Sequence, residues 1–299
     1  MIISASYKTD IPAFYGQWFV NRLDTGFCQM VNPYGGQVYR VGLTRDEVDG
    51  FVFWTKNLGP FLDRLALVHQ RGYPFMVQYS LNGYPRALEF SVVNADRSIE
   101  HMQTLSQRYG PRVAVWRYDP IVFTSLTPPH FHQRTFARLA RALAGTTDEV
   151  VISFAQMYRK TRRNMAWAAG ALGFTWDDPS DELKRSLAAD LTQIAKLHGM
   201  QLTVCAQRQF LVPGAQLASC IDAQRLSDIA GHPIGVPVKG NRPDCACFQS
   251  RDIGEYDTCP HCCVYCYAVG NRGLAQERHR EHDPQDEFLY RPRVAPTPE

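Results

Sequence analysis

The sequence has no apolar run that approaches the roughly 20 residues needed to span a bilayer. Its first ten residues, MIISASYKTD, lack the charged region and the long apolar stretch of a secretory signal peptide. Internal repeats and low-complexity tracts are absent as well. We therefore expect a cytoplasmic protein that has no membrane partner.

The sequence also has little excess of one sign of charge over the other. Lys and Arg number 32 against 29 for Asp and Glu, and the two signs are mixed along the chain. A net charge of +3 gives no strong field for nucleic acid, so a nucleic-acid partner is not favoured. Because 299 residues bury a large core without a stabilising metal, any metal site is expected to serve a function.

Short runs rich in β-branched and aromatic residues alternate with longer stretches of helical periodicity. The runs are apolar almost throughout, as expected of parallel strands that are covered on both faces. The expected strands are Ile2 to Ser6, Gly50 to Thr55, Phe75 to Ser80, Val113 to Tyr118, Glu149 to Phe154 and Gln201 to Cys205. The expected helices are Pro12 to Leu23, Phe61 to Gln70, Ser98 to Tyr109, Pro129 to Leu143, Asp181 to His198 and Val269 to His282.

This alternation predicts an α/β fold with about six right-handed βα units. No G-x-G-x-x-G follows the first strand, which counts against a doubly wound dinucleotide-binding sheet. We expect a partial TIM-like (βα) barrel over residues 1–235. Residues 236–299 are expected to form an irregular cysteine-rich cluster loop and a helix that pack on the same barrel.

Polar residues gather where the expected strands end, and in a parallel barrel these ends share one mouth, where active sites form. Lys56, Arg117 and Asp119 are the candidate catalytic residues, since they are suited to hold a carboxylate, a ribose or a phosphate. The alternative is an internal ring of salt bridges that organises the mouth. Asp10 and Asn57 are candidate cofactor-binding residues by the same reasoning.

Nine cysteines in a reducing compartment need a reason other than disulfides, and six of them fall in one C-terminal stretch. Cys259, Cys263 and Cys266 form a Cys-x3-Cys-x2-Cys triplet. Three thiolates at these spacings can hold one [4Fe–4S] cluster and leave its fourth iron without a cysteine ligand. The alternative is a structural zinc site, but zinc knuckles usually pair cysteines as two hairpins, so the triplet favours iron and sulfide.

The triplet, with Tyr265 directly before its last cysteine, resembles the cluster motif of radical S-adenosylmethionine enzymes, where the motif normally follows the first barrel strand. Here it follows the last expected strand, which lies beside the first in a nearly closed ring. More of the chain resembles an uncharacterised bacterial family, domain of unknown function 1848, which has a radical-enzyme-like cysteine cluster at its C-terminus. The matching segments are Ser4 to Ser6, Thr9 to Pro12, Phe53 to Asn57, Trp116 to Ile121, Ile152 to Phe154 and Asp252 to Gly254.

The resemblance implies an enzyme that uses a C-terminal [4Fe–4S] cluster to cleave S-adenosylmethionine and generate a radical on a small-molecule substrate. An electron donor such as flavodoxin or ferredoxin would then be a partner. Tyr265 and Tyr267 are candidate cofactor contacts, with Tyr267 suited to stack on adenine. Two alternatives stay open: a zinc- or iron–sulfur-stabilised ligand-binding barrel without radical chemistry, and a nucleic-acid lesion repair enzyme, because Arg117 to Ile121 also resembles spore photoproduct lyase.

Four further cysteines indicate a second site at the end of the sixth expected strand and on the loops that follow. Four such ligands would complete a second [4Fe–4S] cluster or a zinc site. The alternative interpretation is that Cys205 and Cys220 are ordinary small core residues. The four are Cys205, Cys220, Cys245 and Cys247. Cys28 is interpreted as an idle buried thiol, and Cys262 is expected to point away from its neighbour Cys263.

Overall fold

The computed structural model describes residues 1–32, 35–240 and 242–291. Its centre is a sheet of eight strands in the order β11-β10-β8-β6-β5-β4-β1-β12, and every neighbouring pair is parallel. The strands are β1 (Ile2–Ala5), β4 (Gly50–Thr55), β5 (Phe75–Ser80), β6 (Ala114–Ile121), β8 (Glu149–Phe154), β10 (Gln201–Val204), β11 (Gln216–Leu217) and β12 (Ser250–Asp252).

From β1 to β11 the order in space follows the order in the chain, without the reversal that defines a doubly wound sheet. The chain then returns to the other side of β1, where β12 pairs with it so that Ile2 lies opposite Ser250. Because β11 and β12 remain as edges, the ring of described strands is open. The predicted α/β fold with a partial barrel of parallel strands is confirmed.

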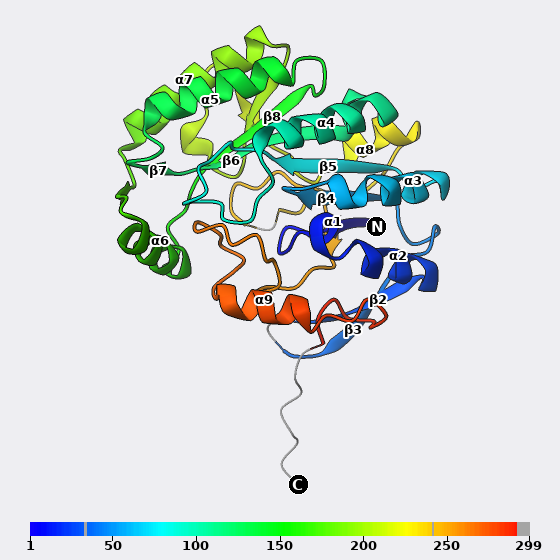
Figure 1. Ribbon diagram of the computed structural model, residues 1–299. Coiled ribbons are helices and arrows are strands. Elements are labelled where there is room, and N and C mark those ends of the chain that lie inside the picture. The colour runs from blue at the N-terminus through cyan, green and yellow to red at the C-terminus, as the bar shows by residue number, and fades with distance from the viewer. Residues whose placement is uncertain (33–34, 241, 292–299) are drawn as a thin grey trace.

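Helices α3 (Leu62–Gln70), α4 (Ala95–Tyr109), α5 (Pro129–Ala142) and α7 (Asp181–Leu197) lie along the outer face of this curved sheet (Figure 1). The other helices are α1 (Ile11–Phe14), α2 (Gly16–Thr25), α6 (Arg159–Leu172), α8 (Ala223–Ala230) and α9 (Arg272–Arg280), with single 3₁₀ turns at Gly59–Phe61, Pro111–Val113 and Arg208–Phe210. Two small antiparallel pairs complete the fold: β2 (Phe27–Val31) with β3 (Val38–Gly42), and β7 (Phe123–Thr124) with β9 (Trp176–Asp177). No helix in these described ranges is long and apolar enough to span a bilayer.

Successive side chains of a strand point to opposite faces, and this alternation separates two cores. Phe51 and Phe53 of β4 face the helices and make edge-to-face contacts with Phe19 of α2 in the main core. Val52, between these two residues, faces the interior of the barrel, as do the corresponding residues of the neighbouring strands, and together they form a second cluster. This interior layer contains Ile2, Val52, Met76, Val115 and Val151 from five neighbouring strands, together with Leu226 of α8.

Two expectations differ from the structure. The helix expected over Pro12 to Leu23 is two helices, since the chain leaves helical geometry at Tyr15, whose buried hydroxyl donates to the carbonyl oxygen of Thr258 at 2.5 Å. The segment after residue 235 is not wholly irregular, because it contributes β12 to the sheet. The helix expected over Val269 to His282 is present as the shorter α9.

Candidate functional site

The interior of the barrel changes from apolar to polar two residues beyond the apolar layer of Ile2, Val52, Met76, Val115 and Val151, toward the carboxyl end of each strand. Trp54 of β4 donates from its indole nitrogen to the hydroxyl of Ser4 on β1 (3.1 Å), and the guanidinium of Arg117 on β6 lies 5.0 Å from the Trp54 ring. Gln78 of β5 and Ser153 of β8 belong to the same level. The carboxyl ends of the strands above this level form what we call the mouth.

Arg117 is the most connected cation of the mouth. Its guanidinium pairs with Asp119 Oδ2 at 2.5 Å and donates to Gln78 Oε1 at 3.1 Å and to Cys220 Sγ at 2.9 Å. Asp119 also accepts a hydrogen bond from the hydroxyl of Ser153. Burial, the largest single cause, would lower the pKa of Arg117, but the charge of Asp119 and contacts with Cys220 and Cys205 together outweigh it, and the net pKa is raised well above its ordinary value. Arg117 therefore carries a permanent charge inside the barrel.

Lys56, directly after β4, makes the second ion pair of the mouth. Its ammonium lies 2.7 Å from Glu89 Oε1 and 3.1 Å from Asn82 Oδ1. The hydroxyl of Tyr265 donates to the same oxygen of Glu89. Burial alone would lower the pKa of Lys56, whereas the charge of Glu89 raises it, and the net shift is upward. The structure thus contains internal ion pairs at both predicted catalytic cations.

The cysteine loop is fastened to the mouth by two buried aspartates. Asp10 receives three hydrogen bonds: Oδ1 accepts from the amide of Ala13 (2.9 Å), while Oδ2 accepts from the amide of Lys56 (2.7 Å) and contacts Nε2 of His261 (2.8 Å). Asp10 thereby joins α1, the loop after β4 and the cysteine loop. Its carboxylate serves to position these segments.

Asp252, at the end of β12, joins that strand to β1 in the same way. Its carboxylate accepts from the hydroxyls of Ser4 and Ser6, both at 2.7 Å, and from the amide of Tyr7 at 3.0 Å. The amide of Gly254 donates to it at 3.0 Å. The cysteine loop therefore starts from a fixed point beside the end of β1.

Cys259, Cys263 and Cys266 are brought together over the ends of β1 and β4. Burial is the largest cause that raises the pKa of each thiol, and charge on Cys266 raises the pKa of the other two. The backbones of His261 and Asp10 lie near enough to the sulfur of Cys259 to lower the pKa of its thiol, and the sulfur of Cys266 accepts from the amide of Ala268 at 3.3 Å.

These surroundings fit an iron–sulfur cluster. Three soft sulfur donors converge, and backbone amides are directed at two of them, as around clusters whose potential is tuned by N–H···S bonds. Lys56 lies close enough to Cys263 to lower the pKa of its thiol. As the side chains stand, no group of three or more His, Cys, Asp or Glu residues in the described part of the chain is arranged to hold a metal ion.

The second cysteine set also comes together. The sulfurs of Cys205 and Cys220 are 3.5 Å apart, and Cys247 contacts both Cys220 and Cys245 through its side chain. Arg242 donates to the sulfur of Cys205 at 3.3 Å. Cys205 and Cys220 are buried, and burial is compatible both with ordinary core residues and with metal ligands.

The remaining candidates have local roles. Asn57 Oδ1 accepts from the amide of Gly59 at 3.2 Å and shapes a turn. Tyr267 is 44% exposed at the mouth, and its hydroxyl donates to the carbonyl oxygen of Tyr7 at 2.7 Å. Cys28 is a buried core residue, and burial raises the pKa of its thiol to about 12. Cys262 contacts Gln276 of α9 at 3.6 Å, on a side away from the triplet's contacts.

A pocket of about 140 Å³ opens beside the mouth. Asn82 and Glu89, the two partners of Lys56, belong to its wall, and the N-terminus of α4 forms another part. A second pocket, of about 210 Å³, lies between β7 and α7 and contains none of the predicted site residues. The first pocket is the one that reaches the candidate site.

The sequence pointed to Lys56 and to the pair Arg117 and Asp119 at the strand ends but missed the partners of Lys56. Glu89 and Asn82 lie in the loop after β5, which carries no recognisable motif. Asp252 stood in one of the segments that carried the family resemblance, and that was the available signal for it. No sequence signal pointed to Arg242, because its contact with Cys205 depends on how the last loops fold.

The sequence model of a family described as a domain of unknown function (DUF1848) matches residues 2–268. The chain belongs to the DUF1848 family. The match takes in all eight strands and the cysteine triplet of this DUF1848 protein. Comparison with curated proteins found no match.

Among solved structures, a crystal structure of D-hydantoinase resembles the DUF1848 chain at 13% sequence identity with a TM-score of 0.29. The similarity covers 65% of this chain, which spans only 37% of the length of that protein. So low a similarity gives no information about the site.

Proposed function

We propose that this protein is a radical S-adenosylmethionine enzyme whose [4Fe–4S] cluster is held by Cys259, Cys263 and Cys266. The observation that carries the proposal is that these three thiols, one buried and two partly buried, lie near enough to one another for charge on Cys266 to raise the pKa of Cys259 and of Cys263. Three ligands leave one iron of a cuboidal cluster open to a small molecule. With the cluster bound, the chemistry supplied is one-electron cleavage of S-adenosylmethionine to a 5′-deoxyadenosyl radical that takes hydrogen from a substrate.

The residues of the chain would orient the reactants and exclude water. Lys56, held by Glu89 beside Cys263, would bind a carboxylate of the cofactor through its ammonium group. Arg117 and Asp119 present an ion pair on the other side of the mouth, suited to polar groups of cofactor or substrate. Tyr267, exposed at the same mouth, offers a ring for adenine.

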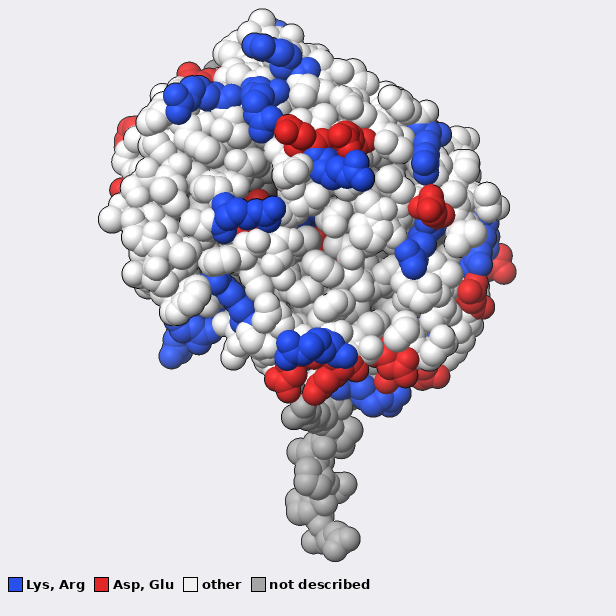
Figure 2. Space-filling view, viewed as in Figure 1, with Lys and Arg blue, Asp and Glu red and all other residues white. Residues whose placement is uncertain are grey.

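A small molecule is the favoured substrate. The pocket beside Glu89, at about 140 Å³, suits a compact ligand and not a duplex. On the face in Figure 2, acidic and basic side chains are interspersed over most of the surface. Such a pattern supplies no continuous basic groove of the kind that nucleic-acid binding requires.

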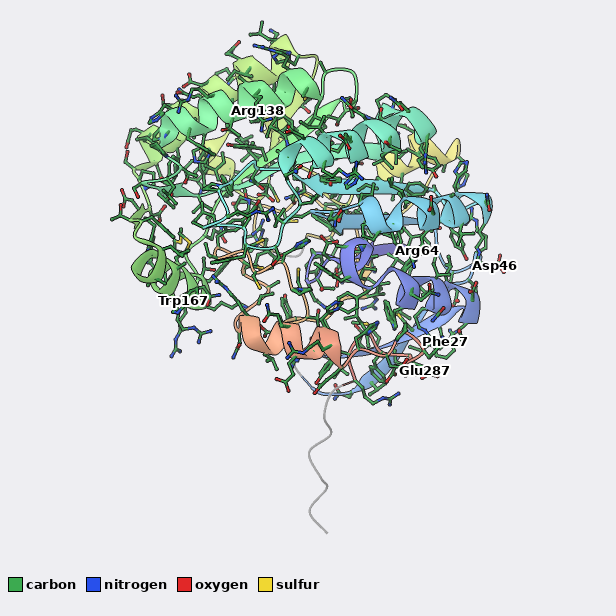
Figure 3. All side chains as sticks on the ribbon, viewed as in Figure 1. Phe27, Asp46, Arg64, Arg138, Trp167 and Glu287 are labelled. Atoms are coloured by element: carbon green, nitrogen blue, oxygen red, sulfur yellow. The ribbon has the colours of Figure 1, made fainter. Side chains whose placement is uncertain are left out.

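Helix α6 has a basic first turn without acidic neighbours in its own sequence, and we propose it as the docking face for an acidic electron carrier such as flavodoxin or ferredoxin. Helix α6 begins Arg159, Lys160, Thr161, Arg162, Arg163 and contains no acidic residue. Trp167 of α6 is 58% exposed and stands at the outer edge of the molecule (Figure 3). Opposite charge on a small redox protein would steer it to this helix.

Helix α6 lies directly against the proposed cluster loop. Arg163 donates to the carbonyl oxygen of Gly270, and Asn164 donates to that of Val269 at 3.1 Å. Met165 packs in one apolar cluster with Cys263. A carrier bound on the exposed face of α6 would therefore be separated from the cysteine loop by this one helix, about 10 Å across with its side chains.

The test is anaerobic reconstitution with iron and sulfide, followed by reduction in the presence of S-adenosylmethionine and an assay for 5′-deoxyadenosine. We expect wild-type protein and Cys262→Ser to load iron and release the nucleoside, and Cys263→Ser to lose both abilities. The control is matched because Cys262 is adjacent in sequence but contacts α9. Equal iron loss in the two variants would refute the ligand assignment, and a loaded cluster without nucleoside release would refute the radical function.

A further inference from the structure

Four thiols outside the triplet form a continuous group at the open side of the barrel. Cys205 follows β10, Cys220 follows β11, and Cys245 and Cys247 precede β12. The sulfur of Cys220 lies 3.5 Å from that of Cys205, and the Cys247 side chain links Cys220 to Cys245. Residues far apart in sequence thus bring four sulfurs to the gap between the two sheet edges.

The surroundings of this group supply positive charge and hydrogen-bond donors. Arg117 donates to the sulfur of Cys220 at 2.9 Å, and Arg242 donates to the sulfur of Cys205 at 3.3 Å. The amide of Ile221 donates to the sulfur of Cys247 at 3.4 Å. The guanidinium of Arg117 also pairs with Asp119, so Arg242 supplies the positive charge beyond that ion pair and offsets part of the net charge of −2 that four thiolates carry around one divalent ion.

We propose that Cys205, Cys220, Cys245 and Cys247 bind one zinc ion in a tetrahedral all-thiolate site. A tetrahedron with zinc–sulfur bonds of about 2.3 Å has edges of about 3.8 Å, close to the 3.5 Å between Cys205 and Cys220. The contacts connect the four sulfurs in a row that ends at the half-buried Cys245. Binding would draw Cys245 inward until the four surround one point.

The site has a structural consequence for the mouth. Among the described residues, the segment that carries Cys245 and Cys247 is joined to the end of β11 by a backbone bond from Phe248 N to Ile221 O at 2.9 Å. A shared ion would fix this segment to the ends of β10 and β11 and so close the gap beside β12. It would also fix Arg117, which donates to Cys220 and pairs with Asp119.

This inference goes beyond the proposed function, since the four thiols are separate from the triplet. The experiment is metal analysis of protein purified without chelators, for wild type, Cys247→Ser, Cys263→Ser and the buried control Cys28→Ala. We expect one equivalent of zinc per chain in wild type, Cys28→Ala and Cys263→Ser, and its loss in Cys247→Ser. Failure of the radical enzyme proposal would leave the zinc content of Cys263→Ser unchanged, so the two proposals fail separately.

A second measurement does not depend on the folding of a variant. Metal-free wild type titrated with cobalt is expected to show the intense sulfur-to-cobalt charge-transfer absorption of tetrahedral thiolate coordination, saturating at one equivalent. Four irons and four sulfides lost specifically from Cys247→Ser would overturn zinc in favour of a second cluster. Zinc that is equally present in Cys247→Ser, or a Cys205–Cys220 disulfide in place of metal, would overturn the site.

Discussion

Replacing Lys56 by methionine tests whether the mouth is organised by its internal ion pairs. Lys56 and Glu89 are 14% and 6% exposed, and their charged atoms are 2.7 Å apart. Without the ammonium, Glu89 keeps the hydroxyl of Tyr265 but has no counter-charge. Removing one partner of a buried ion pair costs about 3–5 kcal/mol, because the other charge stays buried. We expect Lys56→Met to lower the free energy of unfolding by an amount in this range.

The double variant Lys56→Met, Glu89→Gln separates charge from packing. Glutamine keeps an oxygen that accepts from Tyr265, and no unpaired charge is left. We expect the double variant to be more stable than Lys56→Met alone, with a coupling energy of about 2–3 kcal/mol between the two positions. Urea denaturation of the metal-free protein, followed by circular dichroism, measures Lys56→Met, Glu89→Gln and the double variant against wild type.

The same variants report on the cysteine loop. Glu89 forms a β-bridge with Cys263, and Leu88 accepts from the amide of Val264 at 3.0 Å. Iron retention after reconstitution is therefore expected to fall in Lys56→Met and to recover in part in the double variant. A cost below about 1 kcal/mol for Lys56→Met, with additive effects in the double variant, would show that the ion pair does not organise the mouth.

Two further predictions concern the opposite end of the barrel and the basic helix. Arg112 and Arg225 hold the pKa of Asp148 below its usual range despite partial burial, so this ion-paired carboxylate contributes stability above about pH 4 that is lost as the pH falls through its lowered pKa. Acid denaturation of Asp148→Asn is accordingly expected to be shallower over that range than that of wild type, and an unchanged slope would contradict this. On α6, the double variant Arg159→Glu, Arg162→Glu is expected to slow reduction of the cluster by an acidic carrier at low salt but not reduction by dithionite. The control is the same charge reversal at Arg134 and Arg141 of α5, which is expected to change neither rate. Equal slowing by both double variants would refute docking on α6.

The strands of the barrel core were predictable because each is buried on both faces. Gly50 to Thr55 and Phe75 to Ser80 are apolar runs whose bounds the structure reproduces. β11 and β12 escaped prediction for the opposite reason. They are edge strands of two and three residues, and Ser250–Asp252 has the composition of a loop. Their pairing follows from the neighbouring strand and not from their own residues.

The split between α1 and α2 also had a tertiary cause. The sequence from Pro12 to Leu23 has continuous helical periodicity, yet Tyr15 leaves helical geometry and its hydroxyl reaches Thr258 in the cysteine loop. No local signal precedes such a break, because Thr258 lies 243 residues away. The break places α1 against the candidate site.

The sequence identified candidate site residues where their position at the end of a strand is enough to place them at the mouth. Lys56 and Arg117 follow or end buried strands, so the parallel topology places them at the mouth whatever the loops do. Glu89 and Arg242 come from irregular loops, and their roles depend on contacts with Lys56 and Cys205 that no spacing encodes.

The position of the cysteine triplet is explained by the order of the sheet. In the family that the triplet resembles, the cluster loop follows the first strand, whereas here it follows β12, near the end of the chain. β12 pairs in parallel with β1, and Asp252 joins their ends through Ser4 and Ser6, so the loop after β12 starts beside the loop after β1. Cys259 then lies near enough to the backbone of Asp10, in the loop after β1, for that backbone to lower the pKa of its thiol. Under the proposed function, a neighbouring parallel strand would supply the cluster loop from a different place in the sequence, because the location of a site at the mouth depends on the order of strands in space and not on their order along the chain.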